Sequence, residues 1–173
     1  MYRLILPLFF LLCSFTVLSQ NINDDRGYIV KVGDKAPDFT VELTNGQTFT
    51  LSDYKGKIIM LQFTASWCSV CRKEMPFIEK EIYQELKAKD FVLVGIDKDE
   101  SIEKVNKFVE QTKITYPIAL DVGGEVFLKY AHPKAGITRN VIINKKGEIV
   151  YLTRLFEREE FNEMKKVIFG LYD

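Results

Sequence analysis

The sequence has little with which to build a metal or cofactor site. It contains one histidine, His132, and three cysteines, Cys13, Cys68 and Cys71. A closed structural zinc site takes four ligands, commonly two cysteine pairs, and only one close pair is present. No glycine-rich phosphate-binding motif occurs either. We therefore expect no resident metal and no organic cofactor.

An excess of charge of one sign is also missing. The chain has 24 basic and 24 acidic side chains, which gives a formal net charge of zero. Nucleic acids and anionic membrane surfaces attract proteins with a basic excess. We therefore expect neither as a partner. Internal repeats and low-complexity segments are absent as well.

Long apolar runs are confined to the N-terminus. Residues 4–18 are almost continuously apolar, Arg3 precedes them, and Ser19 offers a small residue for cleavage before Gln20. The run is shorter than the roughly 20 residues that a membrane span needs. It predicts a secretory signal peptide over residues 1–19, and an uncleaved anchor is the alternative.

Removal of this segment would leave Cys68 and Cys71 as the only cysteines. We then expect a periplasmic or otherwise extracytoplasmic protein, where disulfides can persist. Residues 20–31 are polar and predict a flexible linker. Residues 32–173 have a length that suits a single domain.

Periodicity and turn residues predict the order ββ-βα-βα-β(α)-ββ-α. Helices that alternate with buried strands predict an α/β domain whose partly parallel sheet is covered on both faces. Pro76 is expected to kink the first helix after two turns. The expected strands are 40–43, 48–51, 58–63, 90–97, 116–120, 140–143 and 148–152, and the expected helices are 68–89, 101–112, 125–130 and 159–169.

The segment from Phe63 to Cys71 joins a buried strand to this first helix. Two cysteines separated by two residues at a helix start can close a small disulfide ring, and the free N–H groups there favour a thiolate. Cys68, on the exposed side, would be the nucleophile, and Cys71 would resolve the mixed disulfide. The spacing also occurs in zinc sites and structural disulfides, but the strand-to-helix context favours a redox-active dithiol.

Several features together resemble the thioredoxin superfamily. They are Trp-Cys-x-x-Cys after a strand, Pro76 in the next helix, an Asn-Gly hairpin upstream and a βα insertion before the last ββα. Within it, residues 36–39 (Ala-Pro-Asp-Phe), residues 65–68 (Ala-Ser-Trp-Cys) and the 91–120 segment are similar to the TlpA/ResA-like extracytoplasmic thiol-disulfide oxidoreductases. The resemblance spans residues 32–170. It implies a thioredoxin-like α/β fold, with a central mixed sheet, helices on both faces and an N-terminal β-hairpin.

The resemblance also implies an activity and partners. The protein would be a monomeric protein disulfide oxidoreductase. Its partners would be disulfide-containing envelope proteins and a membrane electron donor of the thiol-reductase type. The pair Ser69-Val70 between the cysteines has no charge or histidine to stabilise a thiolate, which disfavours a strong oxidant. The family resemblance favours a reductase.

Site residues carry over from the resemblance position by position. Cys68 and Cys71 match the active-site pair, and Trp67 matches the aromatic residue beside the nucleophile. Glu74 matches an acidic residue linked to proton handling, and if it is buried its raised pKa would let it accept the proton of the resolving thiol. Trp67, Val70 and the loop opposite them would form an apolar contact surface for the substrate.

The sequence departs from the family in that opposite loop. The family usually has a cis-proline before its penultimate strand, and here Thr138 takes that position. Without proline a cis bond costs about 2.5–4 kcal/mol, so we expect a trans peptide. Thr138 could still offer its hydroxyl or backbone to the dithiol, and Arg139 could lower the pKa of a nearby thiolate. Both are candidate substrate-binding residues.

Three other functions remain open from the sequence. Peroxiredoxins place a threonine three residues before the peroxidatic cysteine, where this chain has Ala65 and Thr64 comes one residue too early. A Sco-like copper chaperone could use Cys68, Cys71 and His132 as ligands. In a redox-silent binding module the disulfide would be structural, and the surface around Trp67 would hold a partner.

Overall fold

The computed structural model describes residues 26–172, and the predicted signal peptide lies outside them. None of the helices within this described part is long and apolar enough to cross a membrane. The strands are β1 (Thr40–Leu43), β2 (Thr48–Thr50), β3 (Ile58–Thr64), β4 (Phe91–Lys98), β5 (Ile118–Asp121), β6 (Arg139–Ile143) and β7 (Ile149–Arg154). The α-helices are α1 (Ser69–Ile78), α2 (Gln84–Leu86), α3 (Ile102–Thr112), α4 (Glu125–Tyr130) and α5 (Arg158–Gly170).

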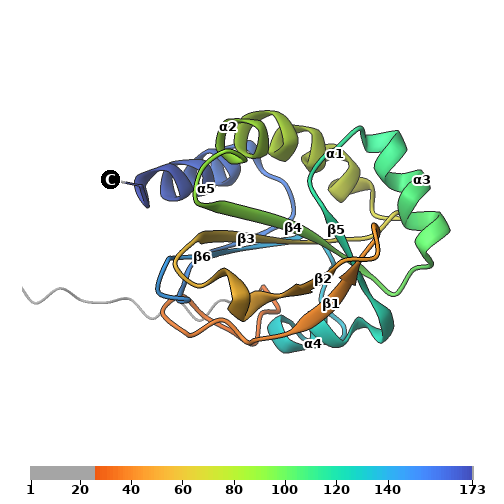
Figure 1. Cartoon of the computed structure of the whole chain (residues 1–173), viewed down its shortest axis with the longest axis horizontal. Coiled ribbons are helices and arrows are strands. Elements are labelled where there is room, and N and C mark those ends of the chain that lie inside the picture. The colour runs from red at the N-terminus through yellow and green to blue at the C-terminus, as the bar shows by residue number, and fades with distance from the viewer. Residues whose placement is uncertain (1–25, 173) are drawn as a thin grey trace, which may run out of the picture.

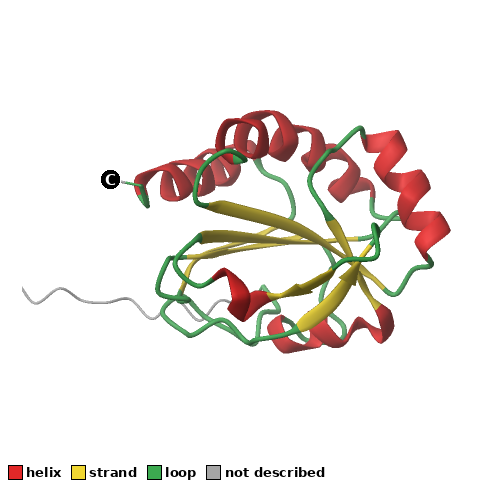
Figure 2. Cartoon of the chain, viewed as in Figure 1, coloured by secondary structure: helices red, strands yellow, loops and turns green. Residues whose placement is uncertain are grey.

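The strands form one mixed sheet in the order β2-β1-β5-β4-β3-β6-β7. Strands β3, β4 and β5 are parallel, while the β1–β2 hairpin and the β6–β7 pair join the sheet antiparallel. Helices α1, α2, α3 and α5 lie over one face and α4 over the other (Figures 1 and 2). This is a thioredoxin-like fold, and the predicted order of elements and N-terminal hairpin are confirmed.

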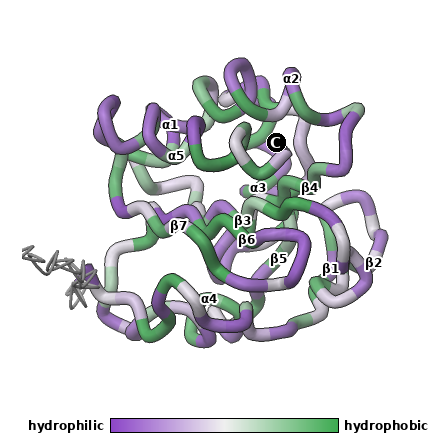
Figure 3. Tube along the Cα trace, turned by 90° about the vertical axis from the view of Figure 1, so that its left-hand side faces the viewer, coloured by the Kyte–Doolittle hydropathy of each residue, from purple (hydrophilic) through white to green (hydrophobic). Residues whose placement is uncertain are grey.

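The layers follow from the hydrophobic pattern of the strands. Every residue of β3 is buried, as expected for a central parallel strand with helices on both faces. Hydrophobic stretches run along the sheet in Figure 3, whereas hydrophilic ones occupy the outer turns. The parallel strands β3, β4 and β5 end at the same edge of the sheet, and α1 begins there. That edge carries the cysteines.

The first helix differs from its prediction. It remains α-helical through Pro76 to Ile78, and the irregularity is a π-helical turn over Glu79–Tyr83 that continues into α2. Proline removes a single N–H from the helix ladder, and the chain continues the helix past it. The N–H of Glu79 already donates to the carbonyls of Met75 and Pro76. A wider π-helical turn therefore begins three residues after Pro76.

The polar segment before the domain is more ordered than predicted. Residues 26–31, assigned above to a flexible linker over 20–31, pack against the domain. The Tyr28 ring is buried, and its hydroxyl donates to the carbonyl oxygen of Thr153 at 2.6 Å. Burial of one aromatic ring with a satisfied hydroxyl outweighs the polar composition around it. The packed domain therefore includes residues from Arg26 onward.

Candidate active site

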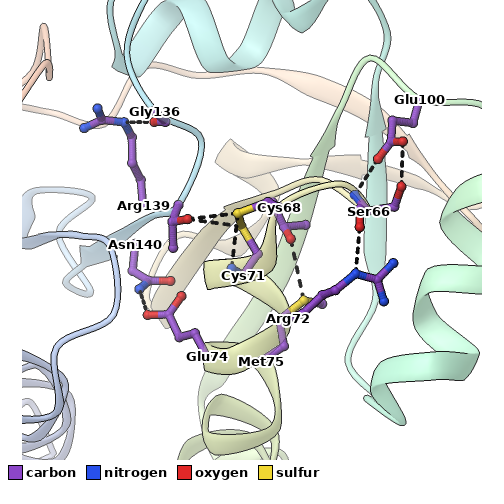
Figure 4. The surroundings of a disulfide bond; sticks show 12 residues. Ser66, Cys68, Cys71, Arg72, Glu74, Met75, Glu100, Gly136, Arg139 and Asn140 are labelled. Atoms are coloured by element: carbon purple, nitrogen blue, oxygen red, sulfur yellow. Dashed lines mark hydrogen bonds between the residues drawn. A yellow bond between two sulfur atoms is a disulfide. The ribbon is translucent and has the colours of Figure 1, made fainter.

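The two cysteines form a disulfide at the N-terminus of α1 (Figure 4). Cys68 occupies the N-cap position, and its Sγ accepts a hydrogen bond from the N–H of Cys71 at 3.2 Å. Cys68 is 7% exposed and Cys71 fully buried, so Cys68 is the more accessible sulfur. A helix N-terminus favours negative charge, so the same N–H can stabilise a Cys68 thiolate after reduction.

Thr138 lies against both sulfurs. Its Oγ1 is 3.1 Å from Cys68 Sγ and 3.2 Å from Cys71 Sγ. None of the described residues follows a cis peptide bond, so the peptide before Thr138 is trans, as predicted. The carbonyl of Thr138 already accepts the N–H of Leu155 at 3.1 Å. Thr138 therefore offers its hydroxyl to the dithiol, while its carbonyl oxygen is used in a hydrogen bond within the domain.

Glu74 is buried on α1, one turn beyond Cys71. Its side chain is 1% exposed, and Asn140 Nδ2 donates to its Oε1 at 2.7 Å. Burial raises the pKa of Glu74 to about 8, although the hydrogen bond from Asn140 and the nearby amide of Gln62 oppose the shift. The condition attached to the sequence prediction, that Glu74 be buried with a raised pKa, is met. Such a group can exchange a proton near neutral pH.

A buried polar network surrounds Glu74 and was missed from the sequence. Asn140 also donates to Thr153 Oγ1 at 2.8 Å. Tyr116 donates its hydroxyl to Gln62 Oε1 at 2.6 Å. The available signal was a glutamine in the apolar run of β3 and an asparagine at the start of β6, since buried polar side chains in strands need partners. The network shows that the region behind the dithiol is polar.

The two outer candidates lie beside the nucleophile as predicted. Trp67 is 67% exposed, directly before Cys68, and Val70 is half-buried. Leu155, whose N–H holds the Thr138 loop, is also exposed.

Arg139 does not serve the predicted role. It is fully buried, and its guanidinium donates to the carbonyls of Gly136 at 2.9 Å and Arg26 at 2.7 Å. Figure 4 shows it directed away from the sulfurs. Successive residues of a strand face opposite sides of the sheet, so Asn140 reaches the α1 face and Arg139 the other. Assigning Arg139 to substrate binding or to thiolate stabilisation was therefore wrong.

The described residues do not form the sites that a peroxidase or a copper chaperone would need. Thr64 donates its hydroxyl to the sulfur of Met75 at 3.5 Å, and Ala65 is buried without a polar side chain, so no peroxide-binding threonine stands before Cys68. Among residues 26–172, no cluster of three or more His, Cys, Asp or Glu side chains could hold a metal ion. The set Cys68, Cys71 and His132 is thus not assembled as a copper site.

Sequence comparison identifies the family. The Redoxin family profile matches residues 31–168. The chain belongs to the redoxin family. Thiol-disulfide oxidoreductase ResA of Bacillus thuringiensis subsp. konkukian (strain 97-27) is 34% identical over 130 residues, which cover 72% of this chain and 73% of the relative. ResA of Bacillus subtilis (strain 168) is 31% identical over 121 residues, 70% and 66% of the two chains. The resemblance to ResA-like proteins is confirmed.

Solved structures agree with the fold. A provisionally assigned protein disulfide isomerase from Bacteroides thetaiotaomicron superposes with a TM-score of 0.82 at 56% identity, covering 84% of this chain and 92% of that one. A provisionally assigned thiol:disulfide interchange protein DsbE from Chlorobium tepidum gives a TM-score of 0.74 at 27% identity, covering 83% and 99%. Together with the Cys68–Cys71 pair, these relatives make this redoxin a dithiol thiol-disulfide oxidoreductase.

Proposed function

We propose that this redoxin is a monomeric reductase of protein disulfides in the cell envelope, exported by a signal peptide over residues 1–19. The observation that supports it most directly is the pairing of an accessible sulfur at a helix N-terminus with a buried carboxyl one turn behind the second sulfur. Cys68, at 7% exposed, is the more accessible cysteine, Cys71 is the fully buried one, and Glu74 supplies the carboxyl. This arrangement separates the attacking group from the resolving group.

The first half of the reaction forms a mixed disulfide. The Cys68 thiolate attacks one sulfur of the substrate disulfide, so a new S–S bond forms as the substrate bond breaks, and the second substrate sulfur leaves as a thiolate. The N–H of Cys71 and the hydroxyl of Thr138 both reach Cys68 Sγ and can donate to the attacking thiolate. Trp67 and Val70 provide apolar contacts for the incoming chain.

The second half returns the cysteines to the disulfide. Glu74 in its ionised form accepts the proton of the Cys71 thiol, and the Cys71 thiolate then attacks Cys68 Sγ and displaces the second substrate thiolate. The substrate gains two electrons and the enzyme dithiol loses two. A membrane thiol donor would then reduce the enzyme disulfide by the reverse exchange.

The direction of electron flow is tested by the Cys68/Cys71 reduction potential. We expect a value near or below about −270 mV when the domain equilibrates in dithiothreitol or glutathione buffers. A value near about −120 mV would identify a strong oxidant and overturn the reductase assignment.

Protein substrates are tested separately. Cys71→Ser should accumulate mixed disulfides with envelope proteins, since the resolving thiol is gone. The matched control is the double variant Cys68→Ser/Cys71→Ser, which should trap none. Equal trapping by both variants would contradict the assignment of Cys68 as nucleophile.

A further inference from the structure

The residue before Trp67 is held on three sides (Figure 4). Ser66 donates its backbone N–H to one carboxylate oxygen of Glu100 and its hydroxyl to the other, the latter at 2.7 Å. Its carbonyl accepts the Nε–H of Arg72 at 2.7 Å. All three hydrogen-bonding groups of one half-buried loop residue are thus engaged by charged side chains. Charge-assisted bonds of this kind are the stronger class of hydrogen bond.

Both charged side chains are anchored elsewhere in the fold. Arg72, on α1, also donates to Gln111 Oε1 at 2.8 Å, and its guanidinium lies 4.8 Å from the centre of the Phe108 ring. Those two residues belong to α3. Glu100 lies in the connection from β4 to α3. The segment before the dithiol is therefore tied to a part of the chain that begins more than 30 residues later.

A second carboxyl stands behind Glu100. Asp97 is fully buried near the end of β4, directly opposite Thr64 of β3 in the parallel register, so it lies at the same edge of the sheet as the dithiol. No donor within residues 26–172 reaches either of its oxygens. Glu100 is the side chain with which it can hydrogen-bond. A bond between two carboxyl groups requires a proton on one of them.

The surroundings place that proton on Asp97. Burial raises the pKa of Asp97 to about 8, and the negative charges of Glu100 and Asp121 add to the shift. Asp121 itself accepts the N–H groups that begin α4. Lys98, the next residue of β4, is turned to the opposite face, where its Nζ lies 4.1 Å from the Phe127 ring centre. Protonated Asp97 is then the donor of the pair, and Glu100 accepts from Asp97 as well as from Ser66.

We propose that Glu100, backed by the buried carboxyl of Asp97, is a positioning residue of the redox site: it holds Ser66 and thereby orders the exposed Trp67 and the nucleophile Cys68. The role rests on the proposed oxidoreductase chemistry at that site. When Asp97 loses its proton in alkaline solution, two carboxylates face each other and the support for Ser66 weakens. The ordering of Trp67 and Cys68 therefore depends on pH through Asp97, a residue that does not touch the substrate.

Trp67 reports on this directly because it is the only tryptophan in the sequence. The experiment measures time-resolved fluorescence anisotropy of the oxidised protein, in which neither thiol can titrate. We expect Glu100→Ala to add a fast local motion of the indole that the wild type lacks at pH 7. The matched control is Glu103→Ala, an exposed glutamate at the start of α3, which should leave the anisotropy unchanged. Unchanged Trp67 motion in Glu100→Ala would overturn the proposal.

Asp97→Asn separates positioning from a merely structural contact. The asparagine amide donates to Glu100 at every pH, so this variant should keep Trp67 ordered at pH 9, where the wild type loosens. If the wild type shows no change between pH 7 and pH 9, or the variant changes equally, the carboxyl pair plays no part. The second result would point to Glu74, which also titrates near pH 8.

The rate of disulfide reduction then tests whether the ordering of Trp67 matters for the reaction. We expect Glu100→Ala to slow the reaction of reduced Cys68 with insulin disulfides about tenfold, and to leave its reaction with a small aromatic disulfide nearly unchanged, since a small reagent needs no ordered Trp67. Equal slowing with both reagents would overturn the positioning role. If the wild type fails to reduce insulin at all, the proposed reductase function fails, while the anisotropy result still tests the support of Ser66.

Discussion

Two buried carboxyl groups lie near the dithiol, and they are built differently. Burial raises the pKa of Glu74 and of Asp97 to about 8 in each case. Glu74, behind Cys71, receives a hydrogen bond from the amide of Asn140. Asp97, opposite the strand that leads to Cys68, has another carboxyl, Glu100, as its partner. The two carboxyls therefore have similarly raised pKa values but different partners, which are a hydrogen-bond donor beside Glu74 and a second carboxyl beside Asp97.

The partner decides what ionisation does. An amide donor can stay bonded to a carboxylate, so Glu74 can lose and regain a proton without rearrangement of its neighbours. A carboxylate partner loses its bond when Asp97 ionises, and repulsion takes its place. The first arrangement suits proton transfer during turnover, and the second suits a support that depends on staying protonated. Each prediction below sharpens or breaks that contrast.

The largest difference is expected in turnover. Glu74→Gln removes the proton acceptor and should slow release of the mixed disulfide about 100-fold, the lower end of the range for general base catalysis. In the wild type this rate should rise with pH through about 8 as Glu74 ionises, and the variant should lose that rise. Asp97→Asn retains a donor to Glu100 and should change the rate little at pH 7. Stopped-flow kinetics would decide, and equal losses in the two variants would break the contrast.

Glu74 and Asp97 should contribute alike to the pH dependence of the free energy of unfolding. A carboxyl whose folded pKa is raised favours the fold while protonated, so its contribution is complete below the unfolded pKa and is lost as pH rises toward 8. Each group should cost about 1.4 kcal/mol of unfolding free energy per pH unit in that window. Glu74→Gln and Asp97→Asn should each remove one such slope in urea titrations of the oxidised protein between pH 5 and pH 8. A wild-type stability that does not fall across this range would contradict both assignments.

Removing the amide donor should affect one carboxyl alone. Asn140→Ala takes away a bond that favours ionised Glu74, so the pKa of Glu74 should rise further, by about one unit. The pH midpoint of mixed-disulfide release should move to higher pH by the same amount, while Trp67 anisotropy keeps its wild-type dependence on pH. Asn106→Ala, an exposed amide on α3, serves as the control. A matching shift in the Trp67 signal would show that the two carboxyls are coupled.

The smallest effect is expected at Thr138, which touches the sulfurs but neither carboxyl. A hydroxyl bonds a thiolate more strongly than a disulfide sulfur, so it favours the reduced form. Thr138→Val should lower the reduction potential, by at most about 30 mV, which corresponds to a tenfold change in the exchange equilibrium constant. The effect is limited because the N–H of Cys71 still reaches Cys68. Thr138→Ser should keep the wild-type potential, and an unchanged value for the valine variant would leave the hydroxyl without a redox role.

Much of this molecule could be predicted from local pattern. The alternation of buried strands with amphipathic helices predicted the order of elements, and most predicted ends fall within two residues of the observed ones. The pair Cys68 and Cys71 after a buried strand predicted the dithiol and its more accessible member. Glu74, three residues after Cys71, came from the family resemblance. These features depend on neighbours along one strand or helix, which regular spacing places together.

The tertiary structure decided which distant residues complete the site. Thr138 reaches Cys68 across 70 positions, Asn140 reaches Glu74 across 66, and Glu100 reaches Ser66 across 34. Each contact depends on how β6 and β4 align with β3, and a shift of one residue along β6 would turn Asn140 to the other face. Arg139 shows the same rule, because its place on β6 puts it on the face away from the dithiol. The sequence determined the reacting sulfurs and the elements that carry them, whereas the register of the sheet decided which polar groups surround them.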